Sequence, residues 1–165
     1  MAVDTSRREI LRDHLAVIFQ EISTDNGDRN TIRPVIMRLV PVNLIQGYPT
    51  LCIGFGPMNL TPINDTRTLF TADTTVIVRG FFEDELTGED AAAYTRESTG
   101  EGLLQDVLRV VIGMSLAHIN DASDPYNISL NRDWQVGPIV WYDESHGYFE
   151  VTFEVMMRHV GVTFE

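Results

Sequence analysis

Histidines are the side chains in this chain of 165 residues that are best suited to catalysis or metal binding. The sequence contains four, His14, His118, His146 and His159. None has a second histidine or a cysteine at the spacing of a zinc site. His118 lies near the end of an expected helix, where a cation is favoured by the helix dipole. The sequence therefore predicts no metal site and no cofactor.

Two short segments contain the residue types of known catalytic or binding motifs. Asp143-Glu-Ser-His146 holds an acid, a nucleophile and a base, but a hydrolytic triad needs those groups to converge in space, and four consecutive loop residues rarely do. Gly54-Phe-Gly-Pro57 is typical of a phosphate loop, yet it lacks a third glycine and a following helix. We interpret both segments as turns and expect no enzymatic activity.

Acidic residues dominate the charge of the chain. There are 24 acidic and 12 basic residues, for a formal net charge of −12, and every basic residue is arginine. Residues 83–101 concentrate this charge without the spacing of a calcium loop, so we interpret them as a solvated face. A negative field repels nucleic acid phosphates. The composition resembles that of proteins from extreme halophiles, and codon bias in a GC-rich genome is an equal alternative.

We expect residues 1–165 to form one domain, and its helices and strands position the residues discussed above. A hydrophobic fraction of 44% is enough for a core. No apolar run approaches the roughly 20 residues that span a membrane, and residues 1–9 lack the apolar stretch of a secretory signal. The single cysteine, Cys52, excludes an internal disulfide.

Helical periodicity occurs in two parts of the sequence. Ser6-Arg-Arg-Glu9 fits a capping box, and apolar residues then recur at helical spacing as far as Ser23. A short helix is expected over residues 89–95, and a long one from near Glu101, where Ser98 and Glu101 repeat the capping-box spacing. The buried stripe of the long helix is predicted to be Leu104, Val107, Leu108, Val111, Ile112, Ser115 and Ile119.

Strands are predicted over residues 34–40, 50–55, 74–82, 126–130, 136–142 and 148–159. The last two form a hairpin across residues 143–147. Alternation is clearest in the final strand, where Phe149, Val151, Phe153, Val155 and Met157 share one face. Residues 59–73 show no periodicity, and we interpret them as a long loop or an extended flap. We expect an α+β fold, with two main helices packed on one mostly antiparallel β-sheet.

This layout resembles the tail terminator (tail completion or neck terminator) proteins of tailed phages and related archaeal viruses. The resemblance covers most of the chain and is one of layout, length and strand character. It depends on the helix pattern of residues 8–22, the strand after Tyr48-Pro49, the strand of residues 76–82, the helix of residues 103–119 and the final strand. The extreme acidity and the insertion at residues 59–73 depart from the family pattern.

The resemblance implies a structural virion protein without catalytic activity. Such proteins form a ring, usually a hexamer, that ends polymerisation at the head-proximal end of the tail tube and joins the tail to the head connector. The implied partners are other copies of the chain, the tail tube protein and a connector or neck protein. DNA would pass without specific binding, no membrane is involved, and the location is the tail or neck of the virion, assembled in the host cytoplasm.

Three groups of residues are candidate contact surfaces in that role. The polar face of the final strand and the start of the acidic stretch are candidates for an assembly or channel surface, and the segment 59–73 is a candidate inter-ring loop. The residues are Glu150, Thr152 and Glu154; Glu83, Asp84 and Glu85; and Asn59, Asn64, Asp65 and Arg67. The alternatives are another neck, minor tail or baseplate component, or a small α+β enzyme or ligand-binding domain.

Overall fold

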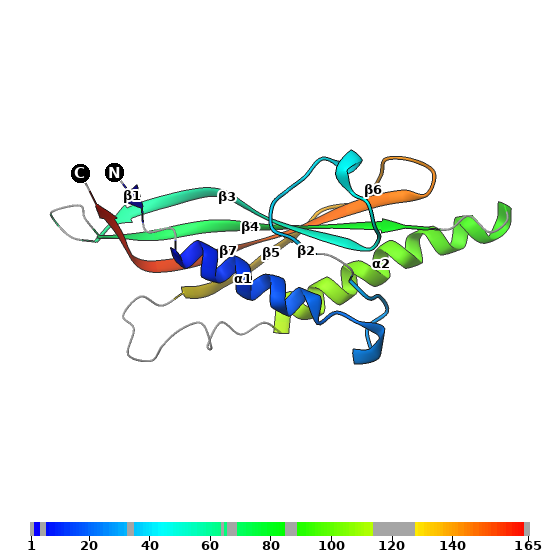
Figure 1. Cartoon of the computed structure of the whole chain (residues 1–165), viewed down its shortest axis with the longest axis horizontal. Helices are drawn as coiled ribbons and strands as arrows, with labels where there is room; N and C mark the ends of the chain where they lie inside the picture. The colour runs from blue at the N-terminus through cyan, green and yellow to red at the C-terminus, as the bar shows by residue number, and fades with distance from the viewer. Residues whose placement is uncertain are drawn as a thin grey trace.

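A mixed β-sheet and two long helices make up the fold in the computed structural model, which describes residues 2–3, 6–32, 35–63, 65, 69–84, 89–113 and 128–163. The predicted α+β class is confirmed. Figure 1 shows the elements along the long axis of the molecule. The helices are α1 (Ser6–Gln20) and α2 (Glu89–Gly113), with short 3-10 turns at Thr24–Asn26 and Val42–Leu44. The strands are β1 (Ala2–Val3), β2 (Val35–Ile36), β3 (Thr50–Pro62), β4 (Leu69–Glu83), β5 (Ile128–Val136), β6 (Val140–Trp141) and β7 (His146–Thr163).

Strand β7 is the central strand of the sheet and pairs with four other strands. Along one side it pairs antiparallel with β4 over almost the whole length of both strands. Along its other side it pairs in turn with β6, β5 and β1, all antiparallel. Strand β3 pairs antiparallel with β4, and β2 adds a short parallel pair next to Leu51 and Cys52 of β3. The predicted hairpin of the last two strands is present as β6 and β7, with Trp141 opposite Gly147.

The segment 59–73, expected to be a long loop or an extended flap, is mostly β-hairpin, so the long loop is not confirmed. Strand β3 continues to Pro62 and β4 begins at Leu69, with Asn59 opposite Asp73 and Thr61 opposite Thr71. Threonine favours extended backbone, and side chains that are polar on both faces give no alternating signal. The register shifts between Phe55 and Met58, where Gly56-Pro57 interrupts the pairing.

The two helices expected over residues 89–120 are a single helix as far as the structure describes them. Helix α2 runs without a break from Glu89 to Gly113; the predicted positions Ser115 and Ile119 lie outside the described residues. Gly100 lies inside this helix and packs against β4, where a Cβ would lie 2.7 Å from Cζ of Phe82. The stripe is also shifted, since Leu103 is buried and Ile112 is 60% exposed.

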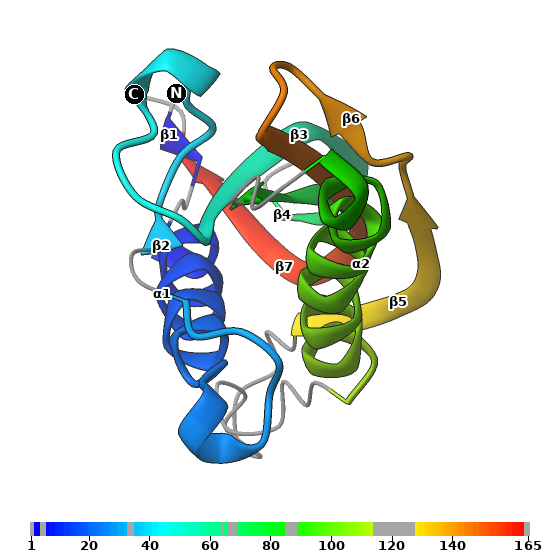
Figure 2. The same cartoon turned by 90° about the vertical axis from the view of Figure 1, so that its right-hand side faces the viewer.

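The main core lies between the sheet and the helices. Phe149, Val151, Phe153, Val155 and Met157 are all buried, as the alternation predicted. They pack with apolar residues of both helices, which lie on the same face of the sheet (Figures 1 and 2). The helix residues in this core include Leu11, Leu15 and Phe19 of α1 and Leu103, Val107 and Val111 of α2.

A second, smaller cluster covers part of the opposite face of the sheet. Cys52 of β3 and Phe81 of β4 are buried there under Val40 and Ile45 of the segment 37–49. This segment was predicted as a strand as far as Val40, but only Val35 and Ile36 pair with β3. Burial raises the pKa of the Cys52 thiol, so the thiol stays protonated at neutral pH.

Candidate assembly surface

The polar side chains of β7 lie on the face of the sheet opposite the helices. Thr152 is half-buried and Glu154 is exposed. Ile77 and Gln135 lie directly opposite Thr152 on the two neighbouring strands, and Thr75 lies opposite Glu154. Directly opposed residues share a face of a sheet. We call this set (Thr75, Ile77, Gln135, Thr152 and Glu154) the open face, because each member is at least partly exposed.

Glu150 belongs to the same face but has a specific partner. The Arg79 Nε–H donates to Glu150 Oε1 at 2.8 Å, and Nη2 of Arg79 contacts the same oxygen. The Arg79 guanidinium also lies over the ring of Tyr148, 5.6 Å from its centre. Glu150 therefore adds little uncompensated charge to the open face.

The acidic residues at the end of β4 have different surroundings from those predicted. Glu83 is exposed, and its Oε1 lies 3.2 Å from Nε2 of His146. Asp84 is only 4% exposed, and its Oδ2 has no hydrogen-bond partner among the residues that the structure describes. The assignment of Asp84 to a channel surface is therefore wrong, because alternation along the strand turns it toward the interior. Glu85 lies outside the described residues.

The predicted inter-ring segment is the outer part of the β3–β4 hairpin. Asn59 is exposed on β3, and Asp65 is exposed in a turn between the two strands. Two apolar side chains near the tip, Leu60 and Ile63, are also exposed. Asn64 and Arg67 lie outside the described residues.

His146 joins the β6–β7 turn to the end of β4. Its Nδ1 lies 2.7 Å from Asp143 Oδ2, and its ring stacks on Tyr142 and lies tilted against the ring of Tyr48. Ser145 Oγ approaches the same Nδ1 atom at 3.4 Å, while Nε2 faces Glu83. A triad places the acid and the nucleophile on different ring nitrogens, so Asp143, Ser145 and His146 lack that arrangement.

Hydrogen bonds from backbone N–H groups lower the pKa of Asp143 in the same turn. The Ser145 and His146 N–H groups both donate to Asp143 Oδ1, at 2.8 and 2.7 Å. The hydrogen bond from Ser145 is the main cause that lowers the pKa of Asp143. The hydroxyls of Tyr48 and Tyr142 lie 2.9 Å apart, and burial together with this hydrogen bond raises the pKa of Tyr142. The turn is thus held by local polar contacts.

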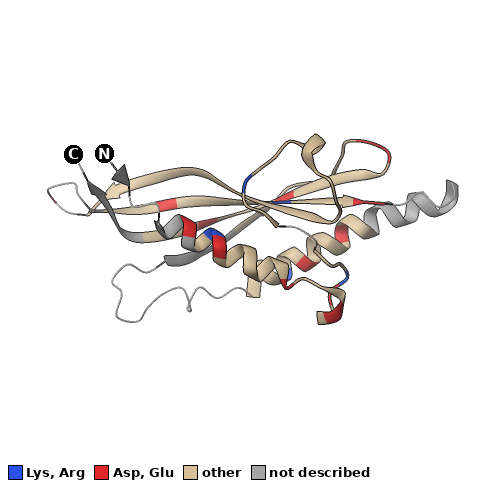
Figure 3. Cartoon of the chain, viewed as in Figure 1, with Lys and Arg blue, Asp and Glu red and all other residues tan. Residues whose placement is uncertain are grey.

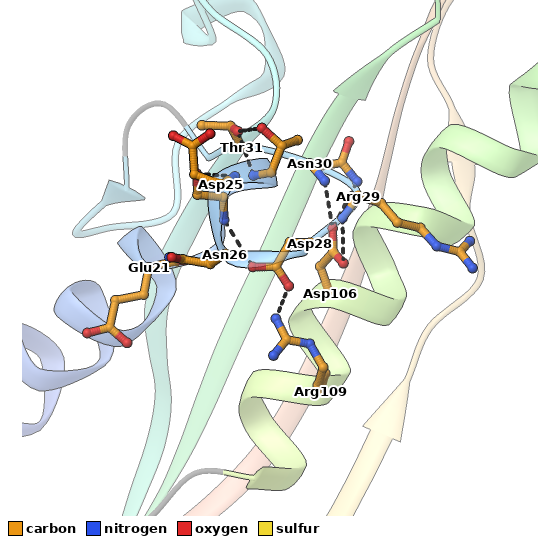
Figure 4. A network of polar contacts seen from close by, with 11 residues as sticks. Glu21, Asp25, Asn26, Asp28, Arg29, Asn30, Thr31, Asp106 and Arg109 are labelled. Atoms are coloured by element: carbon orange, nitrogen blue, oxygen red, sulfur yellow. Dashed lines mark hydrogen bonds and ion pairs between the residues drawn. The ribbon is translucent and has the colours of Figure 1, made fainter.

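The most extensive polar network described lies between the 23–31 segment and α2, and the sequence reasoning missed it (Figure 4). Asp106 of α2 is 5% exposed. Its carboxylate accepts hydrogen bonds from the backbone N–H groups of Arg29 and Asn30, at 3.3 and 3.0 Å, and from the Asn30 side-chain amide at 3.0 Å. One signal was available: an aspartate next to Val107, inside the apolar stripe of a helix, needs buried donors.

Asp28 supplies a second connection in this network. Its Oδ2 accepts the Ser23 backbone N–H at 3.0 Å, and its Oδ1 pairs with Arg109 of α2. Thr24 and Thr31 hydrogen-bond to each other across the base of the segment at 3.1 Å. The contacts of Asp28 and Asp106 fix the segment to the helix.

Acidic residues are spread over several elements of the surface. Figure 3 shows them on α1, on the described part of α2 and in the loop between β6 and β7. Within the described ranges, no group of three or more His, Cys, Asp or Glu side chains has an arrangement that could hold a metal ion. Of the four histidines, His118 lies outside the described residues, and the side chain of His159 is not described.

Comparisons with known proteins place this chain in no family. The sequence matches no protein-family model and no curated protein. Over the part of the chain that the structure describes, none of the helices combines the length and apolar character needed to cross a bilayer.

Proposed function

We propose that this chain is a structural virion protein, a tail terminator that forms a ring at the head-proximal end of a tail tube, with the hexameric order that is usual in the family it resembles. The observation that carries the proposal is the difference between the two faces of the sheet. Both helices cover one face, while the other keeps the open face (Thr75, Ile77, Gln135, Thr152 and Glu154) partly exposed. In the proposed ring the open face lines the channel and the helices lie outside.

A channel of this composition lets DNA pass without holding it. Thr75, Thr152 and Gln135 are neutral, and Glu154 repels phosphate. Nucleic acid affinity comes mainly from lysine and arginine at phosphates, and Arg79 of β4, which lies on this face, is bound to Glu150. Glu83 adds negative charge at the rim, whereas the buried Asp84 adds none.

The β3–β4 hairpin is the proposed contact to the adjacent ring. Its outer part is exposed and mixes polar residues, Asn59 and Asp65, with apolar ones, Leu60 and Ile63. Exposed apolar side chains at the end of a long hairpin favour contact with another protein. The partners in this proposal are the tail tube protein on one side and a connector or neck protein on the other.

The decisive experiment measures molar mass in solution at low and molar salt, followed by negative-stain imaging. We expect rings at high salt, where the Debye length shrinks to about 3 Å and repulsion between copies of charge −12 is screened. A chain that stays monomeric at every salt concentration, even after mixing with the tube protein, would contradict the proposal. In purified virions, a position at the baseplate would favour the alternative of a minor tail component.

A charge substitution tests the channel lining separately. Thr152→Arg places a cation on the open face, and we expect rings of this variant to retain DNA in an electrophoretic mobility assay while wild-type rings do not. Val17→Arg, on α1, is the matched control with the same added charge on the helical side. Equal retention by both variants would show that the open face does not line a channel.

A further inference from the structure

His146 lies between two carboxylates that belong to different elements. Its Nδ1 faces both oxygens of Asp143 in the β6–β7 turn, at 2.8 and 2.7 Å. Its Nε2 lies 3.2 Å from Oε1 of Glu83, the last residue of β4. The His146 side chain is only 22% exposed, so solvent screens these contacts only in part. One partly buried ring thus connects the turn to the end of β4.

Neutral side chains complete the described surroundings of this ring. Tyr48, at the end of the segment 37–49, and Tyr142, after β6, contact it through their rings, and Ser145 Oγ lies 3.4 Å from Nδ1. Burial, together with the hydrogen bond to Tyr48, raises the pKa of Tyr142, so its hydroxyl stays neutral near neutral pH. Glu144, the other acid of the turn, is exposed.

The number of protons on the ring decides whether both carboxylates can be bound. A charged imidazole ring donates hydrogen bonds from both nitrogens, whereas the neutral ring has one N–H and one bare lone pair. When His146 is neutral, one of the two carboxylates faces that lone pair and loses its hydrogen bond. Contact with both Asp143 and Glu83 therefore requires the charged ring.

Asp143 is the better placed of the two acceptors. Its Oδ1 accepts the backbone N–H groups of Ser145 and His146, which hold the carboxylate beside Nδ1. The contact of Glu83 with Nε2 is longer and involves a single oxygen. The hydrogen bond made by one ring nitrogen sets the tautomer of a neutral histidine. A neutral His146 should therefore keep its proton on Nδ1 and present a bare Nε2 to Glu83.

We propose that His146 is a pH-dependent clamp between the β6–β7 turn and the end of β4. The charged ring binds Asp143 and Glu83 together. When the proton leaves Nε2, the contact with Asp143 remains and the contact with Glu83 opens. The adjacent backbone hydrogen bond, from the Asp84 N–H to the Ser145 carbonyl at 2.7 Å, then loses the support of the ion pair. The clamp depends on these contacts alone and operates whether or not the chain forms a ring.

Nitrogen-15 NMR of the histidine rings in the whole chain tests where the proton is held. Spectra are recorded from about pH 5 to about pH 8, the range in which histidine is the usual switch, and a His146→Gln spectrum identifies the His146 signals. We expect both nitrogens to be protonated at the acid end and only Nε2 to lose its proton. A neutral ring with its proton on Nε2, or a ring whose charge does not change in this range, would overturn the proposal.

Hydrogen exchange of the Asp84 amide tests whether the clamp acts on the end of the strand. Its protection factor, which corrects for the intrinsic pH dependence of exchange, should fall about two- to fivefold as His146 becomes neutral, the size expected for a partly exposed ion pair. Glu83→Gln is the matched control, because its amide can accept from a protonated Nε2 and donate to a bare one.

The protection of Asp84 in this control should therefore stay constant over the same pH range. Glu83 is exposed, so the substitution should leave the fold intact, and circular dichroism checks this. A wild-type protection factor that does not change with pH, or an equal fall in both proteins, would overturn the proposal.

Discussion

Asp106 and Asp84 occupy almost equally buried positions, 5% and 4% exposed, in two different regions of the molecule. Asp106 accepts three hydrogen bonds from the 23–31 segment. At Asp84 the backbone N–H donates to the Ser145 carbonyl at 2.7 Å, but Oδ2 of the side chain has no partner within the described part of the chain. A buried carboxylate therefore stabilises the fold only where hydrogen-bond donors surround it.

The two regions also differ in where their donors come from. A segment with turns exposes several backbone N–H groups that no helix or sheet uses, and Asp106 collects two of them. Asp84 lies at the end of β4, where the neighbouring backbone groups are already engaged in strand pairing. Substitutions at Asp106 and Asp84 test this difference.

The largest expected effect is at Asp106. Asp106→Ala leaves the Arg29 and Asn30 N–H groups and the Asn30 amide without an acceptor, so we expect the free energy of unfolding to fall by about 3 kcal/mol. Denaturant unfolding in molar salt measures this loss. Asp106→Asn keeps one acceptor oxygen and should lose less, and an unchanged midpoint for the alanine variant would contradict the network.

Asp84 should respond in the opposite direction. Asp84→Asn removes a buried charge without breaking a side-chain hydrogen bond seen in the structure, so we expect the free energy of unfolding to rise by about 1 kcal/mol. Thermal unfolding of the two proteins side by side is the measurement. A loss of stability would mean that the carboxylate has a partner in the protein as it exists in solution.

The ion pair beside Asp106 should contribute less. Arg109 is 62% exposed in its side chain, so Arg109→Ala should cost no more than about 1 kcal/mol. Asp28→Ala should cost more than Arg109→Ala, because Asp28 also accepts the Ser23 backbone N–H. Denaturant midpoints of the two variants give the order, and the reverse order would show that Arg109 has a role beyond this pair.

The smallest expected effect is pH dependence from Asp143. Its pKa is lowered in the folded protein, so its contribution is present above the unfolded-state pKa and is lost as pH falls through the folded-state value. Asp143→Asn should flatten this part of the acid unfolding curve. Carboxyl NMR titration of Asp143 is the direct measurement, and an ordinary titration midpoint would remove the basis for the effect.

The salt dependence of stability tests the origin of the acidity. If the charge of −12 is an adaptation to high salt, the melting temperature should rise with salt into the molar range as self-repulsion is screened. A flat response would favour codon bias. Asp84→Asn should keep its advantage at every salt concentration, because a buried carboxylate is screened little.

The sequence was sufficient for the parts of the fold that repeat with a fixed period. Phe149, Phe153 and Met157 follow the strand period of two, and Leu11 and Leu15 follow the helical period. The burial of these side chains could therefore be predicted from the sequence. The β3–β4 hairpin beyond Phe55 could not, because polar strands show their pairing only through the partner strand.

The polar contacts were harder to anticipate for a different reason. Asp106 and its donor Asn30 are 76 residues apart in sequence, and Glu150 and Arg79 are 71 apart. No spacing rule connects residues at such separations before the topology is known. The short-range contacts of Asp143 with Ser145 and His146 were visible as a polar turn, which is the interpretation that the sequence supported.

Strand β7 has a further consequence for the order of folding. Its long partner β4 lies far upstream: even the nearest pair of the two strands, Glu83 and His146, is 63 residues apart in sequence, and closing such a loop is slow. During synthesis the β3–β4 hairpin and the apolar face of α1 emerge before β7 exists to cover them. The core therefore depends on β7, the strand that is synthesised last. The negative charge of the chain helps to keep incompletely synthesised copies from associating with one another.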